Sequence, residues 1–125
     1  MNYTQIAEYL NEASTLAHEN ATTHGFYDDI DNLIDYLTVN DQPRLAEIAQ
    51  RNFILAQLAK ICCEVGECVE VIQKQRYYEG LSEELADIAI RTADLAGYLG
   101  YHHGTDIAAK MERNANRPRL HGKLC

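Results

Sequence analysis

Two pairs of acidic residues with equal spacing are the part of this 125-residue sequence best suited to chemistry. Glu64 and Glu67 form the first pair, Glu84 and Asp87 form the second, and sixteen residues lie between the two pairs. Residues three apart on a helix lie about 5 to 6 Å from each other on one face. If the two segments are neighbours, four carboxylates meet in a partly covered space, where repulsion and desolvation raise their pKa values. Since a divalent cation would remove this conflict, the acids predict a metal site.

Oxygen ligands in this number favour a hard cation. Mg²⁺, with Mn²⁺ as a substitute, suits carboxylates better than zinc does, and protein-bound Mg²⁺ commonly also binds substrate phosphates. A phosphate ester is therefore the expected substrate class. Hydrated helix faces also carry acidic pairs, so the alternative is that both pairs simply face solvent. A di-iron bundle is a further alternative, but it needs Glu-x-x-His pairs, and neither acidic segment contains a histidine.

The elements that would position these acids have helical periodicity. Apolar residues recur at three- and four-residue spacing between the few glycines and prolines, and we see no strand pattern. We therefore expect an all-α helical bundle of four to five helices, forming a single domain over residues 1–125. Ser82 and Thr105 are the expected N-caps of the last two helices. The expected helices cover about 6–20, 28–42, 44–75, 83–99 and 105–111.

Segment 44–75 places the first acidic pair opposite its main apolar stripe. That stripe is expected to face the core and consists of Leu55, Leu58, Cys62, Val65, Val69 and Ile72. The acidic face also carries apolar residues, so both sides of this helix are expected to be covered. In segment 83–99 the second acidic pair borders the apolar stripe. Because a short loop joins the two segments, we expect them to run antiparallel with their acids facing each other.

Composition and charge exclude several classes of partner. A net charge of −8 repels nucleic acids and anionic lipids, so we expect no nucleic-acid or membrane partner. No apolar run reaches the 18 or so residues of a membrane helix, and the polar N-terminus lacks the features of a signal peptide. The four cysteines form no CxxC pair. A cytoplasmic protein is therefore expected.

Basic residues concentrate near the C-terminus. Five of the eleven Lys and Arg residues lie in segment 110–125, so the irregular tail 115–125 could fold across the acidic site and bind phosphates. The alternative is a hydrated, frayed terminus. Arg91 either reaches a phosphate or only neutralises Asp87 and Asp94, one turn away on each side. The candidate phosphate ligands are Lys110, Asn114, Arg117, Lys123 and Arg91.

The acidic motif resembles that of a known family. It reads Glu64-Val65-Gly66-Glu67 and then Glu84-Leu85-Ala86-Asp87, which is similar to the ExxE and ExxD motifs of MazG-like nucleoside triphosphate pyrophosphohydrolases, in the all-α NTP pyrophosphatase superfamily. Further stretches resemble small members often encoded by phages, and together they cover most of the chain. These stretches are His18-Glu19-Asn20-Ala21 with Gly25-Phe26, segment 83–96, Lys110-Met111, Asn114, Arg117-Pro118 and His121-Gly122-Lys123.

The resemblance implies a MazG-like fold that hydrolyses a nucleoside triphosphate to the monophosphate and pyrophosphate, with Mg²⁺ held by the four acids. It also implies a homodimer or homotetramer with the site near a subunit interface, which would cover the second apolar face of segment 44–75. Some phage members act on dGTP, which makes dGTP the expected substrate. Many relatives carry a further Glu directly before ExxE, where this chain has Cys63. The general base is therefore open between Glu64 and Glu67.

A nucleobase would need an apolar wall and a few hydrogen-bonding groups. The candidates are His18, Asn20, Phe26 and Phe53, although His18 and Phe26 could equally serve ordinary helix packing. Two other functions stay open. A non-catalytic nucleotide-binding or oligomerisation module would keep the outline of the site without turnover, and Cys63 in place of an acid favours it. A phosphatase would release single phosphates instead of pyrophosphate.

Overall fold

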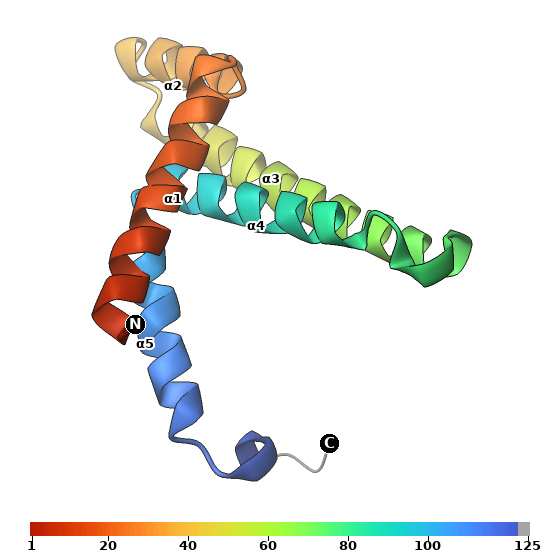
Figure 1. Cartoon of the computed structure of the whole chain (residues 1–125). Coiled ribbons are helices and arrows are strands. Elements are labelled where there is room, and N and C mark those ends of the chain that lie inside the picture. Colours follow the sequence, from red (N-terminus) through yellow and green to blue (C-terminus); the bar gives the residue numbers. More distant parts are fainter. Residues whose placement is uncertain (123–125) are drawn as a thin grey trace.

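The computed structural model describes residues 1–122, and the regular structure of these residues is entirely helical, with no strand among them (Figure 1). The all-α prediction is therefore confirmed for this part of the chain. The α-helices are α1 (Tyr3–Thr23), α2 (Asp28–Val39), α3 (Pro43–Lys74), α4 (Leu81–Tyr98) and α5 (His103–Ala115). Two short 3₁₀ helices are η1 (Arg76–Tyr78) and η2 (Arg119–Gly122). The sequence predicts an irregular tail over 115–125, and the described part of this tail, up to residue 122, contains the helical turn η2.

The helix starts differ from two predicted caps. α4 begins at Leu81 after Gly80, whose φ of 86° suits glycine, so Ser82 already lies inside the helix. α5 begins at His103, and Thr105 is not its N-cap. A side chain from α1 takes over the capping role, because Asn11 Oδ1 accepts hydrogen bonds from the backbone N–H of Gly104 at 2.7 Å and of Thr105 at 3.3 Å. A cap donated by a distant helix leaves no local sequence signal.

The α1–α5 pair packs closely because Gly104 has no side chain. A Cβ at this position would lie 2.2 Å from the carbonyl oxygen of Ala7 and 2.5 Å from the backbone nitrogen of Asn11, both in α1. Neither backbone atom can yield without a shift of the helix. At Gly104 the two helices therefore approach each other so closely that no larger residue fits without a backbone shift.

We expect Gly104→Ala to destabilise the fold by about 1 to 3 kcal/mol or more, because over-packing forces the backbones of α1 and α5 apart. Urea unfolding followed by circular dichroism measures this change. Gly66→Ala is the matched control, since a Cβ at Gly66 in α3 meets nothing within 4 Å. That variant should be stabilised by about 0.5 to 1 kcal/mol through helix propensity. Equal stability of the two variants would contradict the close approach.

α3 and α4 form an antiparallel hairpin closed by η1, as the sequence predicts (Figure 1). The residues of α3 that the chain itself covers at least in part are Ala46, Ala49, Phe53, Ile54, Gln57, Ile61, Glu64, Cys68 and Val71, and all but Ile54 recur every three to four positions. The main apolar stripe, in contrast, stays about half exposed, for example 46% at Leu58 and 50% at Val69. The expectation that this stripe faces the chain's own core is therefore wrong, and the acidic face of α3 packs against α4 instead.

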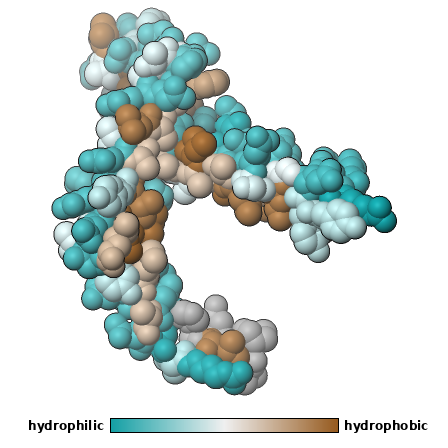
Figure 2. Space-filling model, in the orientation of Figure 1, coloured by the Kyte–Doolittle hydropathy of each residue, from teal (hydrophilic) through white to brown (hydrophobic). Residues whose placement is uncertain are grey.

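The single chain is open in shape. The α1–α5 pair and the α3–α4 hairpin diverge as two arms (Figure 1) from a small core around Tyr27, which packs with Ala21 and Ile30. The accessible surface is 9369 Å², whereas a compact protein of 14.1 kDa exposes roughly 6700 Å². Apolar side chains gather along the concave side between the arms (Figure 2). One chain alone therefore leaves much of its apolar surface uncovered.

Candidate metal centre

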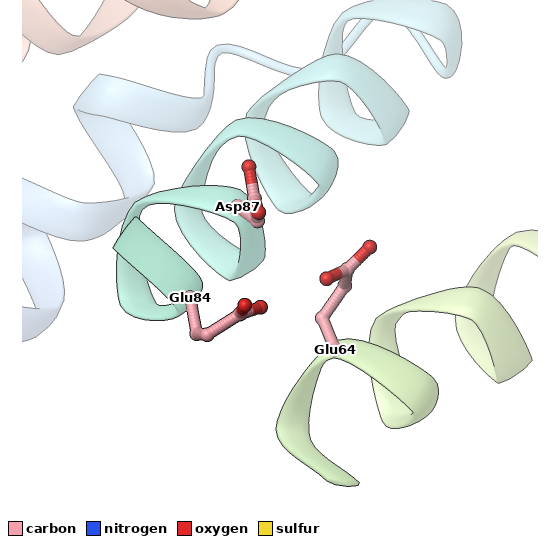
Figure 3. A group of neighbouring side chains, drawn as sticks. All are labelled: Glu64, Glu84 and Asp87. Atoms are coloured by element: carbon pink, nitrogen blue, oxygen red, sulfur yellow. The ribbon is translucent and has the colours of Figure 1, made fainter. Parts of the chain in front are cut away.

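Three of the four predicted acids come together between α3 and α4. Glu64, Glu84 and Asp87 each offer one carboxylate oxygen, and these oxygens all lie within 4.8 Å of one another. Glu64 reaches from α3 toward Glu84, and Asp87 lies one turn further along α4 (Figure 3). The antiparallel hairpin thus brings one acid of the first pair together with both acids of the second. We refer to these three residues as the acidic triad.

The acidic triad fits a hard divalent cation. Glu64 is only 8% exposed, and Oε2 of Glu84 is buried without a hydrogen-bond partner, although a buried acceptor is ordinarily satisfied. A cation between the carboxylates would satisfy that oxygen and offset their repulsion. Burial and the nearby acids raise the pKa of the Cys68 thiol, which favours its neutral form in the metal-free protein. An oxygen-only set favours Mg²⁺ or Mn²⁺.

Glu67, the fourth predicted ligand, lies beside the acidic triad but is not part of it, and its side chain is exposed. Hydrogen bonds from its protonated form to Glu84 and Glu64, together with the negative charges of both, raise the pKa of Glu67 to about 7. A carboxyl group that titrates in this range can hold or release a proton near neutral pH.

We expect the metal-free protein to lose stability as the pH rises from about 4.5 to about 7. Glu67 has a pKa of about 7 in the folded protein against its usual 4.5, so the folded state binds this proton more tightly than the unfolded state. The stabilising contribution of this proton is therefore complete below a pH of about 4.5, and it is lost as the pH rises through about 7. Thermal unfolding of wild type and Glu67→Gln over this pH range isolates the effect, because the variant lacks the titrating group. If the unfolding temperatures of wild type and Glu67→Gln changed in parallel with pH, the raised pKa of Glu67 would be contradicted.

Arg91 pairs across the helices rather than along its own helix. Its Nε donates to Oε1 of Glu64 at 2.5 Å. Among the described residues it forms no ion pair with Asp87 or Asp94, the two neighbours that the sequence offers as partners. Asp94 instead accepts hydrogen bonds from the Tyr27 hydroxyl at 2.8 Å and from Nδ1 of His18 at 3.0 Å. The guanidinium is therefore tied to the acidic triad.

A cavity of about 350 Å³ adjoins the acidic triad, at the C-terminal end of α1 and between α3 and α4. Asn20 and Phe26, two of the predicted base-binding residues, line it. Lys60 and Arg91 bring two positive charges to the same cavity, and Gln57 adds a side-chain amide. The remaining lining residues are Ala17, Ala21, Tyr27, Glu64, Asp87, Ile90 and Asp94.

His18 and Phe53 do not line this cavity. His18 stands edge-on to Tyr27 and is bonded to Asp94, and Phe53 packs against Tyr27 and Tyr98 with ring centroids 5.6 and 5.2 Å apart. Burial is the main cause that raises the pKa of Tyr27, with the hydrogen bond to Asp94 adding to it. His18, Phe53 and Tyr98 therefore pack around Tyr27 and link α1, α3 and α4, whereas Tyr27 itself lines the cavity.

Sequence reasoning assigned no role to Gln57 or Lys60, although both are separated from Glu64 by whole helical turns, seven and four residues before it. That spacing places them on the acidic face of α3 and is the signal by which they could have been found. Tyr27 and its link to Asp94 left no such signal, because the two residues are 67 positions apart.

The predicted C-terminal phosphate ligands do not reach this cavity within the described chain. α5 extends away from the α3–α4 hairpin (Figure 1), and Lys110 lines a separate cavity of about 530 Å³ with Met111 and Arg113. Asn114 is half-buried, and its Oδ1 lacks a hydrogen-bond partner. Arg117 follows α5 and is exposed. Lys123 lies outside the described residues.

Comparison with known proteins adds no identification. No protein-family model matches this sequence, and neither the curated proteins nor the solved structures compared with it gave a match. Among the described residues no helix combines the length and apolar character that crossing a membrane requires.

Proposed function

We propose that this protein hydrolyses a (deoxy)nucleoside triphosphate to the monophosphate and pyrophosphate in a Mg²⁺-dependent reaction, with dGTP as the first substrate to test. The observation that carries the proposal is the acidic triad, with its oxygens within 4.8 Å, next to a cavity that holds two cationic side chains. A divalent cation and basic residues together suit a polyphosphate. The likeness of the ExxE and ExxD motifs to MazG-like pyrophosphohydrolases points the same way.

Glu64, Glu84 and Asp87 would hold the metal, which when bound neutralises phosphate charge and lowers the pKa of water. Water attacks the α-phosphorus, the bond from this phosphorus to the bridging oxygen of the β-phosphate breaks, and pyrophosphate leaves. Glu67 accepts the proton of the attacking water, because it lies beside the acidic triad, whereas Glu64 belongs to the triad and would be committed to the metal.

The cavity residues would bind the remainder of the nucleotide. Lys60 and Arg91 supply positive charge for the phosphates. Asn20 and Gln57 supply amide donors and acceptors, and Phe26 supplies an aromatic face, which together suit a nucleobase. The volume of about 350 Å³ lies in the usual range for small-molecule sites.

We propose further that the protein works as a homodimer or homotetramer. The apolar stripe of α3 and the concave side of the chain are exposed in one copy, and a second copy is the simplest cover for them. In such an assembly the α5 helix of a partner could approach the cavity that its own chain leaves open. Lys110, Asn114 and Arg117 would then reach the phosphates from the neighbouring subunit.

Product analysis tests the reaction. The protein is incubated with each of the four deoxynucleoside triphosphates and Mg²⁺, and the monophosphate, diphosphate, pyrophosphate and orthophosphate are resolved by ion-exchange chromatography. Monophosphate and pyrophosphate in equal amounts are the expected products. Orthophosphate with the diphosphate would indicate a phosphatase instead. Nucleotide binding without any product would indicate a non-catalytic nucleotide-binding module.

A further inference from the structure

Arg91 is the cation that the described structure brings into contact with the acidic triad. The bond from its Nε to Oε1 of Glu64 is short, at 2.5 Å, and the Glu64 side chain is only 11% exposed. A short contact between a guanidinium and a nearly buried carboxylate is a strong, charge-assisted hydrogen bond. Without a divalent cation, this contact is what offsets the negative charge of Glu64.

The same side chain also belongs to the cavity. Arg91 lines it together with Lys60, and the Arg91 side chain is 46% exposed, so it is not held in place by packing on all sides. Asp94, three residues further along α4, does not retain the guanidinium, because its carboxylate is bonded to Tyr27 and His18. Arg91 therefore contacts a carboxylate of the acidic triad and also lines the adjoining cavity.

We infer that Arg91 is an exchangeable counter-ion, which neutralises Glu64 in the metal-free protein and turns to the phosphates of the nucleotide once a divalent cation occupies the acidic triad. The inference rests on the proposed function, which supplies both the cation and the phosphates. A divalent cation and a guanidinium a few ångströms apart repel each other strongly, so they compete for Glu64. Occupation of the acidic triad thus makes Arg91 available for anions, and the two ligands favour each other's binding.

This role gives Arg91 opposite effects on the two ligands. Removal of the guanidinium takes away a competitor of the cation, so metal affinity should increase. It also takes away a charge-assisted hydrogen bond to phosphate, so nucleotide affinity should decrease. A residue that only orients Glu64 for the metal would weaken both, and a residue that only faces solvent would change neither.

The test compares wild type with Arg91→Met by calorimetric titration of Mn²⁺ in the absence of nucleotide, and by KM for the preferred deoxynucleoside triphosphate. We expect Mn²⁺ to bind the variant about tenfold more tightly, through loss of a nearby positive charge. We expect KM to rise by about tenfold or more, through loss of a charged hydrogen bond. Arg91→Lys should stay close to wild type in Mn²⁺ affinity, because it keeps the charge.

Arg51→Met is the matched control. Arg51 is also a cation of the hairpin, but its ion pair is with Glu47 at the surface of α3, so its removal changes net charge without touching the acidic triad. This control should leave both readouts unchanged. Circular dichroism establishes that the variants are folded, and Arg91→Gln replaces Arg91→Met if the latter is not.

The outcomes separate this inference from the proposed function. Wild-type protein that binds Mn²⁺, together with unchanged or weaker binding by Arg91→Met or its replacement Arg91→Gln, would overturn the counter-ion role and leave the metal site standing. Wild-type protein that binds no Mn²⁺ would overturn the metal site and the counter-ion role together. Tighter Mn²⁺ binding with an unchanged KM would overturn the step in which Arg91 turns to the phosphates.

Discussion

Replacing Asp87 by Asn should abolish pyrophosphate release while the helices stay intact. The substitution keeps the size of an exposed side chain but removes the charge of one member of the acidic triad. Loss of a residue that merely supports a metal ligand already lowers activity by about 10- to 100-fold, so loss of a ligand should exceed about a hundredfold. The measurement is pyrophosphate release from the preferred nucleotide in Mg²⁺.

A second readout separates metal binding from chemistry. A ligand that binds only the folded state raises the unfolding temperature, so Mg²⁺ should stabilise wild type but not Asp87→Asn or Glu84→Gln. Glu83→Gln is the matched control, because Glu83 is exposed, adjacent to Glu84 and outside the acidic triad. Undiminished turnover by the Asp87 variant, or equal loss in the Glu83 variant, would contradict the metal assignment.

Glu67→Gln should behave differently from the acidic triad variants. It should lose turnover but keep Mg²⁺-dependent stabilisation, because Glu67 lies outside the acidic triad and serves as the proton acceptor in the proposed reaction. Loss of the stabilisation as well would return Glu67 to the metal ligands, as the sequence predicts. The comparison therefore assigns a role that spacing alone leaves open between Glu64 and Glu67.

The sequence predicts the part of this site that depends on local geometry. Equal spacing within the acidic pairs and a short connecting loop are sufficient to place Glu64 opposite Glu84 and Asp87, because both follow from helical periodicity. Helix number and approximate bounds follow from the same periodicity and from the positions of glycine and proline. Asn20 and Phe26 were assigned to the nucleobase, and they line the cavity next to the acids.

Features that depend on contacts between distant segments were not predictable in this way. Asn11 caps α5 from another helix, and Asp94 is bonded to Tyr27 across 67 positions. Periodicity also cannot tell which apolar face of α3 the chain covers itself. A face with two glutamates and a lysine looks like the outer one, yet Glu64 on this face is buried against α4, where it pairs with Arg91.

Replacing two residues of the exposed apolar stripe of α3 by glutamate should dissociate the proposed oligomer into monomers. Leu58 and Val69 belong to the exposed apolar stripe, so Leu58→Glu with Val69→Glu leaves the packing within one chain largely unchanged. The excess surface of a single chain is roughly 2600 Å² above that of a compact protein, which is within the range that subunit interfaces bury. We therefore expect wild type to be a dimer or tetramer and the double variant to be monomeric.

Size-exclusion chromatography with light scattering measures the molar mass of both proteins. Val39→Glu is the matched control, since Val39 is 85% exposed at the end of α2 and is not a member of the α3 stripe. The double variant should also lose turnover if Lys110 and Arg117 reach the phosphates from a second subunit, even though its acidic triad is intact. A monomeric wild type with full activity would contradict both the interface and the shared site. A dimeric wild type whose monomeric variant retains turnover would instead leave the cavity residues Lys60 and Arg91 as the sufficient phosphate ligands, because each chain carries its own pair.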